Sequence, residues 1–457
     1  MTHVTRWLLA ATFTLAMTQA LAAADPKAEF PLKDGDTWVM AGDSITAQHL
    51  HSNYFEAFCF ARYPNLKFSF RNSGVGGHTI PSTLARFDYD IAAWKPTVVS
   101  VELGMNDQGG APTDKFVANM GTMVGRIREI KARPVIFSPS PKNEGSTMAN
   151  LGGNTRLNEY AVALKDYSAK ENIPYGDQFH ALVDVWGRNK PKETLANSMA
   201  SLKQIALDDS LAGVEHLRGF IAAQEKSPTK SVSMQGDAVH PGPPGQLMMA
   251  AALLKALGAD GAVSSVTVDA AGKVVESNGC KVDAVSGDGV KLVFDRLDER
   301  LPFPIPDEAR AMVAFDPTVL ELSQYLLKVT GLKEGNYTLK INGVLTATVA
   351  AKELNAGVNL TAFGPVAQAK DVNPIVAQGR AILAAVAAKE GVVGQWRGLS
   401  QKAHAADAPA DLKDQLAGLG KKVEEADEKI REAARPQKLH FELAPAVEAG
   451  GPTGASK

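Results

Sequence analysis

Short apolar runs alternate with amphipathic stretches between Thr37 and Leu257. The runs predict strands at residues 36–42, 66–71, 97–103, 134–138 and 173–177. The amphipathic stretches predict helices at residues 48–62, 79–93, 113–131, 154–170 and 244–257. Apolar strands that alternate with helices are typical of a parallel sheet covered on both faces. We therefore expect an α/β domain over residues 25–258, with an excursion at 178–235 that has helical patterning at 198–224.

After Gly258 apolar and polar positions alternate with a period of two, which is typical of half-buried strands. Strands are predicted at residues 263–269, 273–276, 290–295, 325–330, 336–341 and 344–349. Turn-forming residues at 269–272 and 287–289 lie between some of them. We expect an antiparallel β module, organised as a small sandwich, over residues 259–362.

The pattern becomes helical again within residues 363–436. A heptad-like stripe in this segment consists of Leu412, Leu416, Leu419, Val423, Ala426 and Ile430. The stripe fits a helix packed on its own protein, which we favour, or a coiled-coil dimer. Gly418 and Gly420 weaken the coiled-coil alternative. Residues 437–457 are rich in glycine near their end and predict a mobile tail.

The composition of the chain argues against some classes of function. The chain has 457 residues, of which 45% are hydrophobic and 21% charged, with a formal net charge of -2. This composition is that of a globular protein of two or three domains, and it provides no basic field for a nucleic-acid partner. The only cysteines are Cys59 and Cys280, which we expect to be buried and unpaired, with a single disulfide as the alternative.

Residues 1–24 have the pattern of a secretory signal peptide. Arg6 precedes the apolar run 7–17, and small residues that suit cleavage follow it. No later stretch is long and apolar enough to span a bilayer. We therefore expect a secreted or periplasmic protein without a membrane span.

Candidate chemistry begins where the first predicted strand ends, at Gly42-Asp43-Ser44. Parallel sheets place their ligands at the carboxyl ends of their strands, so Ser44 is expected at that edge. A serine hydroxyl becomes a good nucleophile only beside a base, and His240 with Asp237 supplies a base and a group that orients it. Taken alone, each motif is better explained by a turn or a helix cap, and only their combination favours catalysis.

Two further motifs follow the second and third predicted strands: Asn72-Ser73-Gly74-Val75-Gly76-Gly77-His78-Thr79 and Gly104-Met105-Asn106-Asp107. With Gly-Asp-Ser and Asp-x-x-His, these four motifs in this order resemble the SGNH hydrolases, also called the GDSL esterase/lipase superfamily. The resemblance covers residues 35–257. It departs from the family pattern at Ile45, where leucine is usual, and this change is conservative.

The resemblance implies a flavodoxin-like three-layer α/β fold and a serine hydrolase without a cofactor. It assigns Ser44 as nucleophile, His240 as base and Asp237 as its orienting group. The oxyanion would be bound by the backbone N–H groups of Ser44 and Gly77 and by the side chain of Asn106. Gly74 and Gly76 remain alternatives to Gly77.

The neighbours His78, Asp107 and Gln108 are expected to bind substrate. The other histidines do not form a set with the spacing of metal ligands, so no metal is expected.

The residues around the expected site favour a small acyl group. The segments 46–49, 76–79 and 107–110 consist of small and polar residues, which suit a short acyl group on a hydrophilic alcohol. We expect an esterase for short-chain carboxylic esters that deacetylates carbohydrate, acting on a small-molecule or polysaccharide ester. The alternatives are a lipid or aryl esterase, and a catalytically silent carbohydrate-binding homologue. The sequence leaves the oligomeric state open.

Overall fold

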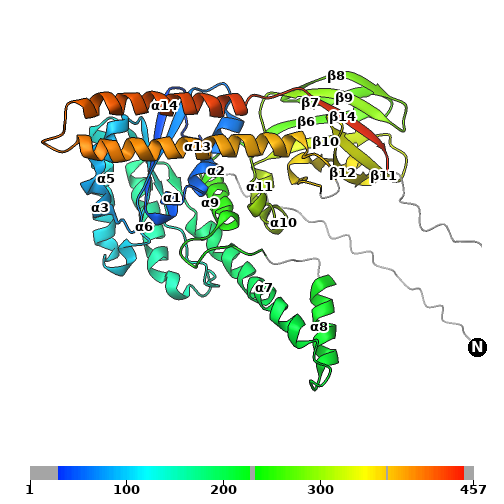
Figure 1. The fold of residues 1–457 in the computed structure, drawn as a ribbon, viewed down its shortest axis with the longest axis horizontal. Helices are drawn as coiled ribbons and strands as arrows, with labels where there is room; N and C mark the ends of the chain where they lie inside the picture. Colours follow the sequence, from blue (N-terminus) through cyan, green and yellow to red (C-terminus); the bar gives the residue numbers. More distant parts are fainter. Residues whose placement is uncertain (1–28, 227–231, 367–368, 447–457) are drawn as a thin grey trace, which may run out of the picture.

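The computed structural model describes residues 29–226, 232–366 and 369–446 (Figure 1). The predicted signal segment 1–24 therefore lies outside the described residues, as do residues 447–457 of the predicted tail. No helix in the described part of the chain is long and apolar enough to cross a membrane.

The first domain is built on a five-stranded parallel sheet, as predicted. Its strand order is β2-β1-β3-β4-β5, with β1 Asp36–Gly42, β2 Phe68–Gly74, β3 Val98–Glu102, β4 Arg133–Phe137 and β5 Tyr175–Gly176. The helices that accompany it are α1 Ser44–Ala47, α2 His51–Arg62, α3 Ile80–Ala85, α4 Phe87–Asp90, α5 Thr113–Glu129, α6 Thr155–Glu171 and α9 Pro243–Ala256. The single helix expected at 79–93 is divided at Arg86, whose backbone leaves the helical region at φ -106° and ψ 6°.

Alternate residues of β1 point into different cores, which gives the domain three layers. Trp38 and Met40 lie in a core that includes Phe55 of α2. Val39 and Ala41 lie in a second core, which includes apolar residues of α5. Because both faces of β1 are buried, its sequence is apolar throughout.

The excursion at 178–235 contains α7 (Phe179–Ile205) and α8 (Val214–Lys226), which project from the domain (Figure 1). The prediction placed the helical start too late, at residue 198. Gly187 and Pro191 weaken the helical pattern, although Pro191 is accommodated inside α7.

The β module consists of two sheets, with strand orders β13-β10-β6-β7 and β12-β11-β14-β9-β8. The strands are β6 Ala262–Asp269, β7 Lys273–Asn278, β8 Cys280–Gly287, β9 Leu292–Asp298, β10 Gln324–Thr330, β11 Asn336–Ile341, β12 Val344–Ala350, β13 Val358–Asn359 and β14 Leu439–Pro445. The expected antiparallel pairing holds except that β6 and β10 are parallel.

Strand β14 corrects the prediction of a mobile tail over residues 437–457. It lies between β11 and β9 in the middle of its sheet, and Leu439, Phe441 and Leu443 fill the module's core. The chain thus leaves the module after β13, forms the C-terminal helices and returns to complete the module. Cys59 and Cys280 are both buried and unpaired, as expected.

Helices α13 (Pro374–Ala403) and α14 (Asp411–Ala433) run side by side along the α/β domain (Figure 1). The N-terminal end of α13 reaches the β module, where Ile375 packs against the module's core. The stripe of α14 packs within the chain, where Val423 and Ile430 are buried. The pair also covers β2, an edge strand. Arg431, Lys389 and Arg397 donate hydrogen bonds to the carbonyl groups of Phe68, Phe70 and Gly74, respectively. These contacts satisfy acceptors that an open edge would leave exposed.

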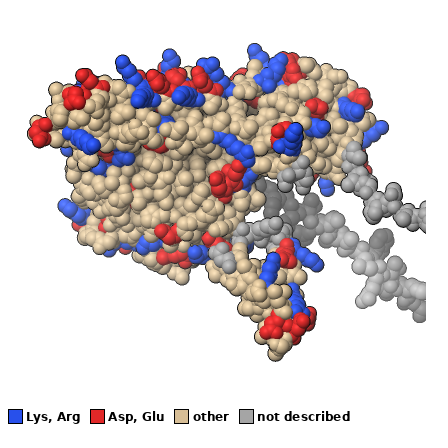
Figure 2. All heavy atoms as spheres, in the orientation of Figure 1, with Lys and Arg blue, Asp and Glu red and all other residues tan. Residues whose placement is uncertain are grey.

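Charged side chains of both signs mix along the face drawn in Figure 2, above all over α14 and at the tip formed by α7 and α8. No large area of a single sign stands out on this face.

Candidate active site

The turn between β1 and α1 places Ser44 at the carboxyl end of the sheet. Asp43 caps α1, because its carboxylate accepts a hydrogen bond from the N–H of Ile45 at 2.9 Å. Gly42 makes the turn possible, since a Cβ atom there would lie 2.0 Å from Oγ1 of Thr46. The half-buried Ser44 is therefore held at the start of α1 by a turn that admits only glycine before Asp43.

Ser44, His240 and Asp237 come together as a triad. Oγ of Ser44 lies 2.8 Å from Nε2 of His240. On the other side of the ring, Nδ1 of His240 lies 3.2 and 3.1 Å from Oδ1 and Oδ2 of Asp237. The loop that carries both residues is closed by a bridge between Gly236 and Pro241.

The loop also fixes the charge of Asp237. Its Oδ1 accepts hydrogen bonds from the N–H groups of His240 and Val239, both at 2.7 Å. The hydrogen bonds from the backbone and ring of His240 lower the pKa of Asp237 below its ordinary value. An ionised Asp237 selects the tautomer in which Nδ1 of His240 carries the proton. Nε2 then has a lone pair for the hydroxyl proton of Ser44, as a general base requires.

The glycine-rich loop narrows the choice of oxyanion donor. The N–H of Gly74 donates to Oδ1 of Asn72 at 2.8 Å, and the N–H of Val75 donates to the carbonyl of Gly42 at 3.1 Å. For Gly76 and Gly77, the described residues provide no acceptor for the N–H group. Gly77 is exposed and has φ +76°, a conformation that favours glycine. Gly74 is thus engaged in the fold, whereas Gly76 and Gly77 keep a free donor.

Asn106 lies between the nucleophile turn and this loop. Its Nδ2 donates to the carbonyl of His78 at 3.1 Å and to Oδ2 of Asp43 at 3.3 Å. Both of its amide hydrogens are therefore engaged. Burial, reinforced by the nearby carboxyl of Glu102, raises the pKa of Asp43 to about 7.

The three residues expected to bind substrate have different surroundings. Asp107 is buried, and its Oδ1 accepts a hydrogen bond from the N–H of Ile80 at 3.1 Å; its expected role in substrate binding stays a prediction. The amide of Gln108 donates to the carbonyl of Met105 at 2.8 Å and is held within its own loop. His78 is half-buried beside Gly77, and its Nδ1 accepts a hydrogen bond from Nε of Arg86 at 3.1 Å.

The structure contains a buried carboxyl close to α1, that of Glu102, which the sequence analysis did not predict. Glu102 accepts hydrogen bonds from Thr46 of α1 and from Gln178, each at 2.9 Å. Burial raises the pKa of Glu102 to about 7. Burial also lowers the pKa of the adjacent His51 to about 4, and Nε2 of this histidine lies 3.5 Å from Oε2 of Glu102. The one signal in the sequence is an acidic residue within the apolar run 97–103.

Among the described residues, no three His, Cys, Asp or Glu side chains come together so that they could hold a metal ion.

Comparison with known proteins agrees with this geometry. Residues 40–198 match the model of the GDSL-like Lipase/Acylhydrolase family. The match confirms that this part of the chain resembles the GDSL-like hydrolases. The match includes Ser44, Gly77 and Asn106, and it indicates an ester hydrolase or acylhydrolase. None of the curated proteins compared with the chain matches it.

Solved structures extend the likeness of fold beyond the GDSL-like domain. BT4096, described as a gut microbial diltiazem-metabolizing enzyme, is 20% identical with a TM-score of 0.67, and the match covers 92% of this chain and 100% of that one. Axe2, an acetylxylan esterase from Geobacillus stearothermophilus, is 20% identical with a TM-score of 0.35, covering 50% of this chain and 95% of its own. The first likeness shows a shared fold that includes the C-terminal parts, and the second is too weak to support an argument.

Proposed function

We propose that this protein is a serine esterase that hydrolyses short-chain carboxylic esters through an acyl-enzyme. The proposal rests on the 2.8 Å contact between Oγ of Ser44 and Nε2 of His240, whose ring is oriented by Asp237. A hydroxyl, a base and an oriented acid are the groups that acyl transfer to serine requires.

The site contains a group that can perform each step of ester hydrolysis. Oγ of Ser44 forms a bond to the ester carbonyl carbon as Nε2 of His240 takes its proton. The free N–H of Gly77 and one N–H of Asn106 stabilise the negative charge on the carbonyl oxygen. The C–O bond to the alcohol then breaks, and the alcohol leaves with the proton from His240. Water, activated by the same imidazole, hydrolyses the acyl-enzyme and restores Ser44.

The proposed substrate is an acetylated carbohydrate. The segments that follow β2 and β3 are small and polar at 76–79 and 107–110, which suits a short acyl group and a hydroxylated alcohol. The signal-like segment 1–24 supports a secreted or periplasmic location, where such polymers occur. The β module fits this proposal by analogy with multidomain enzymes that act on glycans.

One surface favours a second candidate, an aryl esterase. A groove begins at Gln48, directly after α1, and runs between the α1–α2 connection and α13. Much of its lining is apolar, including Leu50, Tyr54 and Leu383. None of Ser44, Asp237 and His240 lines this groove, so it would hold only a part of the alcohol that extends away from the ester carbonyl. An aromatic or apolar alcohol would suit its walls better than a sugar.

Two assays on the purified protein distinguish these substrates. The first measures acetate released from acetylated xylan and pectin, and the second measures hydrolysis of p-nitrophenyl esters with acyl chains of increasing length. We expect acetate release from a glycan and a preference for acetyl over longer chains, with both activities lost in Ser44→Ala. Preference for chains of eight carbons or more, without acetate release from any glycan, would favour a lipid esterase. Activity on aryl acetates alone would favour the second candidate.

A further inference from the structure

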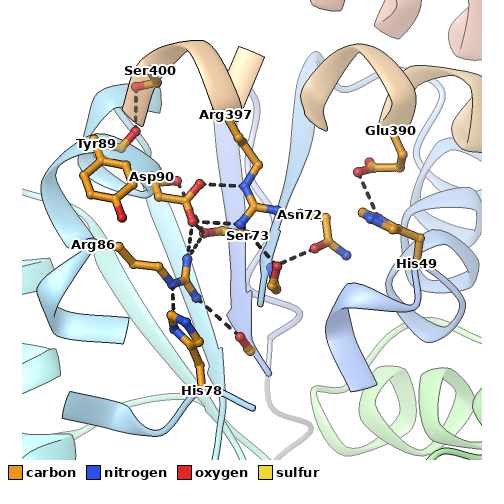
Figure 3. A network of polar contacts seen from close by, with 12 residues as sticks. His49, Asn72, Ser73, His78, Arg86, Tyr89, Asp90, Glu390, Arg397 and Ser400 are labelled. Carbon is orange, nitrogen blue, oxygen red and sulfur yellow. Dashed lines mark hydrogen bonds and ion pairs between the residues drawn. The ribbon is translucent and has the colours of Figure 1, made fainter. Parts of the chain in front are cut away.

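Helix α13 reaches the loop that carries the free N–H groups of the site. We refer to residues 74–79 as the donor loop. Arg397 of α13 donates from Nη2 to the carbonyl of Gly74 at 3.2 Å, at the start of this loop (Figure 3). The same guanidinium forms a two-pronged ion pair with Asp90, with Nε 2.5 Å from Oδ1 and Nη2 2.8 Å from Oδ2. One side chain of the C-terminal segment therefore contacts both α4 and the donor loop.

Asp90 connects Arg397 to a second guanidinium. The Asp90 side chain is buried, and its Oδ2 also accepts hydrogen bonds from Arg86 and, at 2.9 Å, from Ser73. Burial alone would raise the pKa of Asp90, but the hydrogen bonds and charges of Arg397 and Arg86 bring it below its ordinary value. A buried carboxylate with two cationic partners remains charged and holds both of them in fixed positions.

Arg86 carries the network to the other end of the donor loop. Its Nε donates to Nδ1 of His78 at 3.1 Å, and its Nη1 donates to Oγ of Ser73 at 2.8 Å. His78 directly follows Gly77, and its carbonyl accepts the hydrogen bond from Asn106. The network Arg397–Asp90–Arg86–His78, drawn in Figure 3, therefore contacts the loop at Gly74 and at His78. These two residues lie before and after Gly76 and Gly77 in the chain.

These contacts matter because Gly76 and Gly77, in the middle of the donor loop, have no side chains that could hold the loop in place. Gly76 and Gly77 are exposed, and a Cβ atom at Gly77 would meet nothing within 4 Å. Glycine also has more backbone freedom than any other residue. Since an oxyanion donor acts only when it is held in place, the order of this loop must come from contacts outside it.

We propose that Arg397 is a positioning residue that, through Gly74 and the Asp90–Arg86 pair, holds the N–H of Gly77 toward the carbonyl group attacked by Ser44. The inference rests on the proposed esterase function. It assigns the C-terminal helix a direct part in turnover, although Arg397 itself does not contact substrate. Because Asp90 keeps Arg86 as a partner, loss of Arg397 should loosen the loop while the fold survives.

The test compares Arg397→Ala with a matched variant on the same helix. Ser400 donates to the carbonyl of Tyr89 at 2.6 Å, so Ser400→Ala removes a contact between α13 and α4 that does not involve the donor loop. Steady-state hydrolysis of p-nitrophenyl acetate gives kcat and KM for each variant. Hydrogen exchange, read by mass spectrometry, reports on the hydrogen-bonded amides of Val75 and His78.

We expect Arg397→Ala to lower kcat by about 10- to 100-fold, with KM changed less than about threefold, because a misplaced donor acts on the transition state. Exchange in the donor loop should become faster, while the thermal unfolding midpoint stays close to that of the wild type. Arg397→Lys should recover part of kcat, since it keeps the charge beside Asp90 but not the planar fork. Ser400→Ala should leave kcat and loop exchange unchanged.

Equal kcat and equal loop exchange in Arg397→Ala and the wild type would overturn the proposal. Equal losses in Arg397→Ala and Ser400→Ala would also overturn it, because docking of α13 would then explain both. If Arg397→Ala fails to fold, Arg397→Gln, which keeps most of the side-chain stem, is compared in the same way. If the wild type hydrolyses no ester, the esterase function fails, while the exchange comparison still decides whether Arg397 orders the loop.

Discussion

The side-chain amide of Asn106 donates to the main-chain carbonyl of His78 over 3.1 Å. Its other hydrogen is directed to Oδ2 of Asp43 at 3.3 Å, so the expected oxyanion donor is engaged on both sides. A substrate oxygen must replace one of these acceptors. The contact with Asp43 is the longer one, and burial with the nearby Glu102 raises the pKa of this carboxyl to about 7. A protonated carboxyl accepts a hydrogen bond less strongly, so Asp43 is the acceptor that we expect substrate to displace.

Asn106→Ala should lower kcat by about 10²- to 10³-fold with little change in KM, because its N–H stabilises charge that exists only in the transition state. Steady-state kinetics with p-nitrophenyl acetate measures both constants. Thr122→Ala is the control, since Thr122 is exposed on α5 and its hydroxyl bonds only within that helix. A change confined to KM in Asn106→Ala would contradict the oxyanion role.

His240→Gln should abolish nearly all turnover, and Asp237→Asn should be somewhat less damaging. The carboxylate of Asp237 is 67% exposed, so water screens part of its interaction with the imidazolium. Single-turnover kinetics on both variants and on the double variant measures these losses, which should not add, because triad members act as a unit. Full activity of Asp237→Asn would show that another group orients His240.

Glu102 should make the protein less stable as the pH rises. Its pKa is about 7 in the folded protein, owing to burial, and about 4.3 in an unfolded chain. Between these values the unfolded chain has released a proton that the folded protein still holds, so the free energy of unfolding falls, by up to about 1.4 kcal/mol per pH unit. Denaturant unfolding at pH 4.5 and about pH 7.5 should show a smaller fall in Glu102→Gln than in the wild type. In Glu334→Gln, a control at an exposed position, the free energy of unfolding should fall by as much as in the wild type. An equal fall in all three proteins would refute this prediction.

Lys389→Met should destabilise the protein by about 3–5 kcal/mol, because removal of one partner leaves a buried charge unpaired. Nζ of Lys389 lies 2.6 Å from both oxygens of Glu56 on α2, and both side chains are almost completely buried. Urea unfolding of this variant is compared with that of Lys402→Met, an exposed position of the same helix, which should change stability by less than about 0.5 kcal/mol. Adding Glu56→Leu should restore only part of the loss, because the buried Glu390, whose Oε1 lies 3.1 Å from Nζ of Lys389, also loses its partner. Equal stability of the two lysine variants would exclude a role for the ion pair in joining α13 to the domain.

The parts of the molecule that the sequence predicted depend on local patterns. The apolar runs predicted every strand of the parallel sheet, because strands buried on both faces are apolar throughout. The motifs around Ser44 and His240 could be assigned because a parallel sheet brings strand ends together. In contrast, β14 follows two long helices, and nothing near Leu439 shows that β11 and β9 leave a place between them.

The contacts that support the site leave no comparable pattern in the sequence. Arg86 and Asp90 are four residues apart, a spacing that allows a local ion pair, but their partner Arg397 follows Asp90 by 307 residues. The engagement of both Asn106 hydrogens and the burial of Asp107 also depend on tertiary contacts. Sequence motifs therefore predicted the candidate reacting groups, whereas the structure was needed to find which contacts hold them in place.

The most direct measurement is mass spectrometry of the protein after reaction with a fluorophosphonate, followed by peptide mapping. The triad geometry predicts one phosphonyl group per chain, on the peptide that contains Ser44, and no labelling in Ser44→Ala. His240→Gln should label far more slowly than the wild type, because Ser44 then lacks its base. Labelling of another residue, or esterase activity above a trace in Ser44→Ala, would contradict the assignment of Ser44 as the nucleophile.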